Sequence, residues 1–215
     1  MTQQQRIAFI GGGNMASAII GGLLRQGFPV VHMDVVEPWE EARVRLENDF
    51  HLNAHATPGE FLRQADMIVW AVKPQMFKDA AAAVAQWNTQ AVHLSVMAGI
   101  PSDSIARATG NERVVRTMPN TPALIGKGMT ALFARPCVTA AERQWATDIL
   151  SSTGATVWLT EEAQLDAVTA LSGSGPAYVF ALVGALAQAA QAHGMGGDLA
   201  RTLITQTVRG AALMA

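Results

Sequence analysis

A glycine-rich turn near the start of the chain constrains the fold more than any other feature. The apolar residues 7–10 have the composition of a strand that is buried on both faces, and Gly11-Gly12-Gly13 follow directly. Small and apolar residues then recur at helical spacing as far as Leu24. A strand, a glycine turn and a helix form the context that a G-x-G-x-x-G/A dinucleotide fingerprint requires. The pattern therefore predicts dinucleotide binding at residues 11–16.

Each small residue of this turn has a physical task in such a site. Gly11 permits the tight turn, Gly13 lets the backbone approach a pyrophosphate, and Ala16 lets the helix pack close to the strand. The free N–H groups at the start of the helix, at the positive end of its dipole, then face the phosphates. A purely structural strand-to-helix turn is the alternative interpretation.

Strand-like and helix-like segments alternate beyond the turn, which predicts an α/β fold with a parallel, doubly wound, Rossmann-like sheet. The expected strands after the first are residues 30–37, 53–56, 66–72, 92–97, 113–118, 128–133 and 156–159. Helix starts are expected from capping boxes at Thr57–Glu60 and Thr139–Glu142 and from a cap at Ser102. From residue 161 only helical patterns occur. We therefore expect a dinucleotide-binding domain over residues 1–160 and a small all-α substrate and dimerisation domain over residues 161–215.

Two charged residues follow predicted strands at the edge where ligands bind in parallel sheets. Glu37 lies about 20 residues beyond the glycine turn, where an acidic residue usually binds the adenosine ribose diol and repels a 2′-phosphate. This position favours NAD over NADP, and a solvated carboxylate at a strand end is the alternative. Lys73 is a candidate contact to cofactor or substrate, although a lone lysine there is commonly solvated.

Composition limits the class of protein. The net charge is −2, which gives no electrostatic footprint for nucleic acid. One cysteine excludes an internal disulfide and suits a reducing compartment. No signal-peptide pattern occurs, and the longest apolar run, residues 176–187, is shorter than the roughly 18 residues of a membrane span. We therefore expect a cytoplasmic protein that does not enter a membrane.

The second half predicts association with a second copy. Only 15% of the residues are charged, and the C-terminal helices are rich in alanine and glycine, which lets helices approach closely. Capping of one end of the sheet domain is the alternative. The five histidines have no metal-like spacing, so no metal site is expected, and no catalytic side chain is assigned.

Several motifs together resemble those of the pyrroline-5-carboxylate reductase family. They are residues 10–16, 71–75, 95–100, the MPNTP stretch at 118–122, and the SGSGPAY stretch at 172–178. The resemblance implies reduction of 1-pyrroline-5-carboxylate to L-proline, the last step of proline biosynthesis. It favours NADP(H) as the cofactor and leaves NAD(H) possible. It also implies homodimers formed by the C-terminal helices, some of which stack into larger rings.

The resemblance further implies where the cofactor binds. Its contacts would be Ile10, Gly11, Gly12, Gly13, Asn14, Met15, Asn53 near the adenosine, Ala71, Val72, Lys73, Pro74, Val96, Met97 and Ala98, with Glu37 added from the strand pattern. For the substrate pocket we take Asn120, Thr121, Ser172 and Ser174, because they are polar breaks between apolar elements. Ordinary turn chemistry explains these four residues equally simply.

One departure and two alternatives remain. Family members usually continue beyond the point that corresponds to residue 215, with a Ser-Pro-Gly-Gly-Thr-Thr-like loop in the proline-ring pocket, so we expect the helical domain to be incomplete here. A 3-hydroxyacid dehydrogenase-like oxidoreductase is the first alternative, but such enzymes use a lysine on the helical half, and residues 161–215 contain none. A dinucleotide-binding module without catalytic activity is the second.

Overall fold

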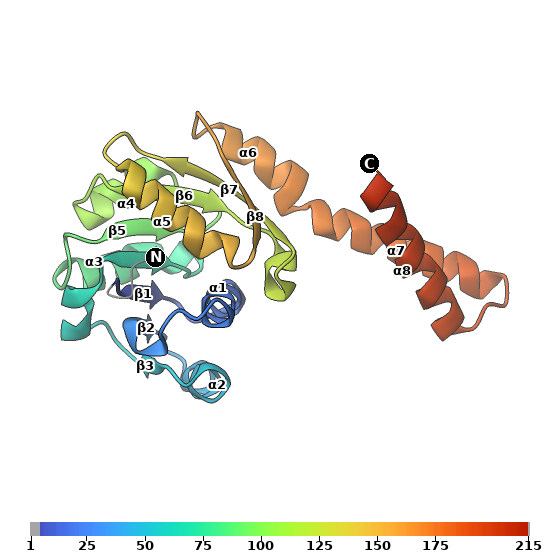
Figure 1. The fold of residues 1–215 in the computed structure, drawn as a ribbon, viewed down its shortest axis with the longest axis horizontal. Coiled ribbons are helices and arrows are strands. Elements are labelled where there is room, and N and C mark those ends of the chain that lie inside the picture. Colours follow the sequence, from blue (N-terminus) through green and yellow to red (C-terminus); the bar gives the residue numbers. More distant parts are fainter. Residues whose placement is uncertain (1–4, 215) are drawn as a thin grey trace. The chain divides into compact units, whose positions relative to one another are not determined.

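The computed structural model describes residues 5–214, and these form two compact units that meet between Gly173 and Ser174. The first unit is an α/β sheet domain and the second is helical, as Figure 1 shows. The predicted fold class is thereby confirmed. The first unit ends later than the domain boundary predicted near Thr160, because helix α6 (Gln164–Val168) packs against strands of the sheet.

The first unit is built on one eight-stranded sheet with the order β3-β2-β1-β4-β5-β6-β7-β8. The strands are β1 (Ile7–Ile10), β2 (Met33–Val36), β3 (Asn53–His55), β4 (Met67–Trp70), β5 (Val92–Ser95), β6 (Val114–Met118), β7 (Gly128–Ala134) and β8 (Gly154–Trp158). The first six strands are parallel and have the order found in doubly wound dinucleotide-binding sheets.

Strand β7 breaks the parallel pattern, because it runs antiparallel to β6, and β8 then runs parallel to β7. The expectation of a parallel sheet is therefore wrong for this edge. Residues 119–127 join β6 to β7 through a short 3-10 helix, Thr121–Ile125. A parallel neighbour needs a crossover of roughly a dozen or more residues, so this short connection reverses the chain direction.

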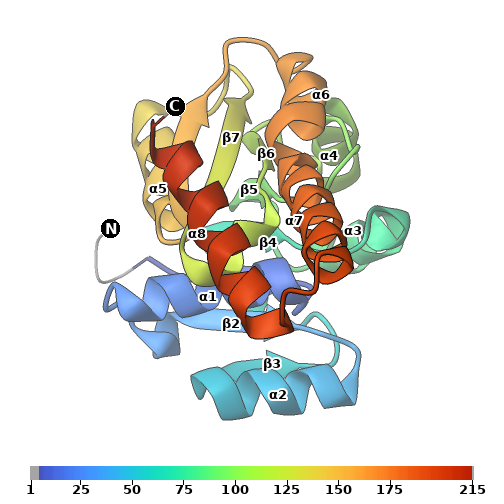
Figure 2. The same cartoon turned by 90° about the vertical axis from the view of Figure 1, so that its right-hand side faces the viewer.

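Helices cover both faces of the sheet, as Figure 2 shows. On one face lie α1 (Asn14–Arg25), α2 (Glu40–Phe50) and α5 (Ala140–Ser151). On the other lie α3 (Phe77–Ala85) and α4 (Ser102–Thr109). Alternate residues of the strands belong to the two cores, for example Phe9 to the first and Ile10 to the second. Burial on both faces explains why the strands read as continuous apolar runs.

Local start signals have mixed outcomes. The capping box of Thr139 and Glu142 is confirmed, since both of its hydrogen bonds form at the start of α5. The capping box predicted at Thr57 is wrong: the segment forms a 3-10 helix, Glu60–Gln64, that follows Gly59 without a side-chain cap. That segment is too short for an α-helix because β4 begins at Met67. The strand predicted at residues 30–37 begins with a 3-10 turn, Val30–His32, before β2.

The predicted cap at Ser102 is also wrong, because a distant carboxylate binds this residue. Ser102 is the first residue of α4, and both its N–H and its hydroxyl donate to Glu162, at 2.7 and 2.5 Å. The Arg116 guanidinium on β6 also donates to Glu162, at 2.9 Å. These bonds join the segment before α6 to two elements of the sheet domain, which accounts for its place in the first unit.

Trp70 and His93 form a buried pair on neighbouring strands β4 and β5. Trp70 Nε1 donates to His93 Nδ1 at 3.0 Å, and both side chains are fully buried. Burial, with a smaller effect from the positive charge of Arg113, lowers the pKa of His93 to about 4. The imidazole is therefore neutral at physiological pH and serves as an acceptor in the core.

We expect the free energy of unfolding to fall as the pH decreases from about 6.5 to 4. In this window the unfolded chain binds a proton at His93 while the folded chain does not, which favours unfolding by up to roughly 3 kcal/mol. Urea denaturation at several pH values measures the effect. His93→Gln, which keeps an acceptor for Trp70, should show a shallower pH dependence than His193→Gln on the exposed surface. Equal slopes in the two variants would contradict this role.

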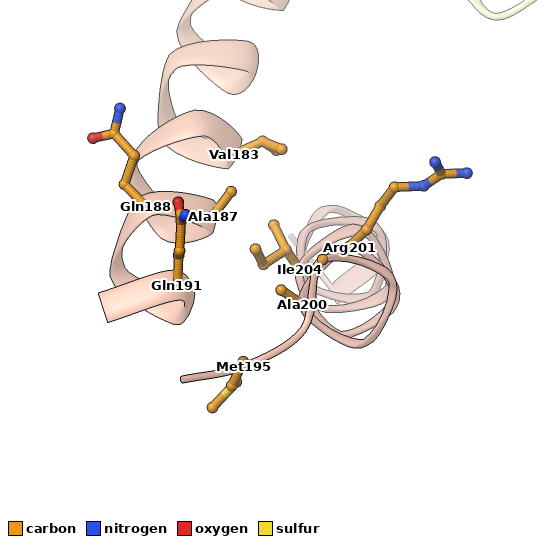
Figure 3. A pocket seen from close by; sticks show the side chains of 9 residues that line it. Val183, Ala187, Gln188, Gln191, Met195, Ala200, Arg201 and Ile204 are labelled. Atoms are coloured by element: carbon orange, nitrogen blue, oxygen red, sulfur yellow. The ribbon is translucent and has the colours of Figure 1, made fainter. Parts of the chain in front are cut away.

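The second unit is a pair of helices, α7 (Gly175–Ala192) and α8 (Gly197–Met214), joined by a turn in which Gly194 has a φ of +77°. Figure 3 shows their facing side chains, with Val183 and Ala187 of α7 opposite Ile204 of α8. They line a cavity of about 640 Å³. Within the described chain no residue of α7 is buried, and large apolar side chains such as Phe180 and Leu182 are exposed.

One helical stretch, Gln164–Ala192, is long and apolar enough to cross a membrane by length and composition alone. The expectation that the apolar run is too short for a span is wrong, because the helix starts before residue 176 and passes through a π-helical turn, Thr169–Gly173. Length and composition do not separate a membrane span from a helix that another protein chain covers.

Candidate functional site

A cavity of about 310 Å³ opens beside the carboxyl ends of β1 and β4. Its walls come from the glycine turn, the residues after β2, the start of α2 and the segment after β4, and they consist of Gly11, Gly12, Gly13, Glu37, Pro38, Trp39, Ala42, Arg45, Ala71, Val72, Lys73 and Met76. The strand order reverses between β1 and β4, and ligands of doubly wound sheets bind at this switch point. The fold thus gathers three of the predicted cofactor segments around one cavity.

The glycine turn has the two properties that the fingerprint predicts. Gly11 has a φ of +99°, and a Cβ there would lie 2.6 Å from the carbonyl oxygen of Ala71, so the turn requires glycine. A Cβ at Gly13 would meet nothing within 4 Å, which leaves its backbone open to a ligand. Among the described residues no side chain caps α1, so its first N–H groups remain available to an anion. These features fit a dinucleotide diphosphate.

Glu37 is fixed in the wall of this cavity. Its carboxylate accepts hydrogen bonds from the backbone N–H groups of Gly12, at 2.7 Å, and Trp39, at 3.0 Å. The residue is only 7% exposed, so the alternative of a solvated carboxylate is wrong. Arg43 donates to the main-chain carbonyl oxygens of Glu37 and Pro38, at 3.0 and 2.7 Å. A carboxylate has about four acceptor sites, so two remain for ligand hydroxyls.

A second, more apolar cavity of about 260 Å³ adjoins the first and shares Pro38, Val72 and Met76 with it. Its other lining residues are Ile10, Val36, Ala56, Pro58, Gln75, Asp79, Ala80 and Ala83. Apolar walls with few polar groups are typical of sites that bind a flat heterocycle. The pair of cavities therefore offers room for an adenosine beside the diphosphate turn.

Asn53 is a predicted cofactor residue that lines neither cavity. It is exposed at the beginning of β3 and pairs with Asp34, whereas ligand contacts lie beyond the carboxyl end of the strand. Ala56 and Pro58, which follow β3, line the second cavity in its place. The role of Asn53 stays a prediction that this placement does not support.

The remaining cofactor residues lie at the same edge of the sheet or next to it. Asn14 and Met15 begin α1, Pro74 begins a 3-10 helix after β4, and residues 96–98 follow β5. The segment after β5 places Met97 in the core and leaves Ala98 exposed. These positions are compatible with contacts to a cofactor that extends along the edge from β1 to β5.

Asn120 and Ser172 come together in the first unit. Asn120 Nδ2 donates to the Ser172 carbonyl oxygen at 3.0 Å, and Asn120 Oδ1 accepts from the N–H of Met129 at 2.9 Å. Thr121 is exposed beside them, and Ser174 belongs to the second unit. Both ends of the Asn120 amide are therefore used in holding the loop after β6.

Sequence reasoning missed several wall residues, among them Trp39, Ala42 and Arg45. A usable signal was present, because these three positions are spaced by three and so lie on neighbouring turns of a helix that starts just after Glu37.

No group of three or more His, Cys, Asp or Glu side chains suited to a metal occurs among residues 5–214. Lys73 is exposed in the cavity wall. The described site can therefore bind an anion at the start of α1, a diol at Glu37 and a flat base in the second cavity.

Comparisons with known proteins agree with this geometry. Residues 162–215 match a family model described as pyrroline-5-carboxylate reductase dimerisation, and residues 6–99 match one described as NADP oxidoreductase, coenzyme F420-dependent. The pyrroline-5-carboxylate reductase of Pseudomonas aeruginosa is 43% identical over 98% of this chain and 78% of its own length.

Solved structures extend the comparison to the fold. A pyrroline-5-carboxylate reductase from Coxiella burnetii superposes with a TM-score of 0.87 at 33% identity, over 99% of this chain and 80% of that one. A Plasmodium falciparum pyrroline carboxylate reductase with NADP bound gives a TM-score of 0.89 at 26% identity, over 100% and 79%. By its sequence, its sheet topology and its glycine turn, this chain belongs to the pyrroline-5-carboxylate reductase family.

Proposed function

We propose that the protein reduces 1-pyrroline-5-carboxylate to L-proline with a nicotinamide dinucleotide, the last step of proline biosynthesis. The observation that carries this proposal is the open, uncapped start of α1 beside Gly11 and Gly13, at the point where the strand order reverses. It is supported by the similarity of the chain to pyrroline-5-carboxylate reductases. The relatives favour NADP(H) as the cofactor, and NAD(H) is the alternative.

The reaction requires few catalytic side chains. When bound, a reduced nicotinamide would supply a hydride to the imine carbon, which is ring carbon 2 of the substrate and becomes Cδ of proline, while the ring nitrogen gains one proton and the dinucleotide leaves oxidised. The residues of this chain bind the dinucleotide and the substrate and orient them toward each other. Gly11, Gly13 and the N–H groups of α1 hold the diphosphate, and the segments after β4 and β5 extend the contacts along the sheet edge. Most of the rate gain should come from this alignment.

The substrate carboxylate needs N–H or hydroxyl donors, and we assign these to the loop after β6 and to the serine-rich turn. Because both ends of the Asn120 amide are engaged, Asn120 holds the loop in place. The hydroxyls of Thr121 and Ser172 are the candidate donors, the second of them by exchanging its 3.3 Å bond to the Val168 carbonyl oxygen. The assignment is supported by the bond that links Asn120 to the backbone of Ser172.

Nicotinamide absorbance with different substrates tests the proposal. We expect oxidation of the reduced cofactor with pyrroline carboxylate and none with small hydroxyacids. Asn120→Ala should lower kcat/KM by roughly tenfold or more, whereas Gln144→Ala, an exposed amide on α5, should leave it unchanged. Turnover of a hydroxyacid would favour the dehydrogenase alternative. Cofactor binding without turnover of either substrate would favour a non-catalytic module.

We further propose a cytoplasmic homodimer, or a larger ring of dimers, formed through α7 and α8. The match of residues 162–215 to a dimerisation family and the uncovered apolar side chains of α7 support association of like chains. The partners that we assign are the small-molecule substrate and a second copy, without nucleic acid or membrane.

A further inference from the structure

We infer that Glu37 and Arg45 act in opposition to set the choice between NADH and NADPH, with Glu37 disfavouring the 2′-phosphate of NADPH. The inference rests on the proposed function only for the identity of the ligand as a nicotinamide dinucleotide. It is argued from two residues of this chain, and it differs from the NADP named in the family description and bound in the Plasmodium relative.

Glu37 has little freedom to leave the cavity wall. Two backbone N–H groups hold its two oxygens, and the side chain packs against the glycine turn, where a Cβ on Gly12 would lie 3.2 Å from Glu37 Cβ and Cγ. One of those N–H groups belongs to the fingerprint itself. The carboxylate position is therefore coupled to the turn that receives the diphosphate.

The charge of Glu37 has no compensating cation among the salt bridges of residues 5–214. Arg43, its near neighbour, donates to carbonyl oxygens instead. A ribose diol can donate hydrogen bonds to the free acceptor sites of this carboxylate, as in other sheets of this build. A phosphate in the same place would face a like charge, and such a contact costs several kcal/mol.

Arg45 lies on the same cavity wall and has the opposite effect. It is exposed on α2, and its guanidinium is a good partner for a phosphate because it presents a planar set of N–H donors. An exposed guanidinium is screened by solvent and salt, whereas the carboxylate of Glu37 is buried. Glu37 therefore has the larger influence, and NADH should bind more tightly than NADPH.

Calorimetric titration of the purified full chain with NADH and NADPH measures the ratio of the two Kd values directly. We expect tighter binding of NADH by the wild type. Glu37→Gln should shift the ratio toward NADPH by about tenfold or more, and Arg45→Gln should shift it toward NADH. Glu40→Gln, an exposed acid on the same helix that does not line the cavity, is the matched control.

A wild type that binds NADPH more tightly than NADH would overturn the inference, and so would a ratio that neither Glu37→Gln nor Arg45→Gln changes. Arg45 is exposed, so its variant tests the inference even where Glu37→Gln lowers stability. The outcomes for the reaction are separate. A Kd ratio that shifts in the variants, without turnover of pyrroline carboxylate, supports this inference and contradicts the proposed function. Turnover of pyrroline carboxylate with an unchanged Kd ratio supports the proposed function and contradicts this inference.

Discussion

Gly11→Ala is expected to unfold or strongly destabilise the sheet edge and to abolish dinucleotide binding. The added Cβ would lie 2.6 and 2.7 Å from the carbonyl oxygen and carbon of Ala71 and 2.9 Å from the N of Val72, all backbone atoms after β4. The φ of +99° adds strain for any side chain. We expect a loss of about 3 kcal/mol in the free energy of unfolding, measured by urea denaturation.

Gly13→Ala is the matched control, because it separates stability from binding. A Cβ at Gly13 meets nothing within 4 Å and φ is −74°, so the fold should tolerate it. The methyl group would nevertheless stand between the backbone and the diphosphate, so the Kd for the dinucleotide should rise. A Gly11→Ala protein with the stability and Kd of the wild type would refute the role assigned to the turn.

Glu162→Ala is expected to produce the second large effect. Glu162 accepts two hydrogen bonds from Ser102 and one from Arg116, and its loss would leave the guanidinium of Arg116, a residue that is 9% exposed, without this partner. Arg116 is buried whereas Glu162 is half-buried, so the cost of leaving the guanidinium unpaired is reduced by solvent, and we expect a loss of about 2 kcal/mol in unfolding free energy. Glu161→Ala, at an exposed neighbour, should change little.

The stabilising contribution of Glu162 should also depend on pH. Burial raises the pKa of this carboxyl, but the hydrogen bonds from Ser102 and the charge of Arg116 outweigh burial and hold the pKa below its usual value of 4.5. The contribution is therefore complete above pH 4.5 and is lost as the pH falls through the lower pKa of the folded state. A Glu162→Ala variant whose stability equals that of the wild type at pH 7 would contradict this account.

Local patterns were sufficient for the first half of the sheet. The apolar strands and the glycine turn depend on neighbouring residues, and the fold realises both at the expected positions. The position of Glu37 at a strand end could be predicted too. Its burial could not, because the glycine turn, whose Gly12 N–H binds the carboxylate, reaches Glu37 only after β1 and β2 have paired.

The errors arise where distant segments compete with local ones. Ser102 reads as a helix cap, but a carboxylate sixty residues further along the chain takes its hydroxyl. The role of Asn53, which was placed by resemblance, stays a prediction, and the register of β3 against β2 puts this residue at the beginning of its strand. The direction of β7 follows from the length of its connection to β6, which hydrophobic pattern does not encode.

The uncovered side chains of α7 have a thermodynamic consequence. In the proposed homodimer, association removes this apolar surface from water, so the free energy of association becomes part of the folding equilibrium of the helical unit. Mass action then makes the stability of that unit a function of how much protein is present. Dilution alone should weaken it, while the sheet domain, whose core is complete within one chain, is less sensitive.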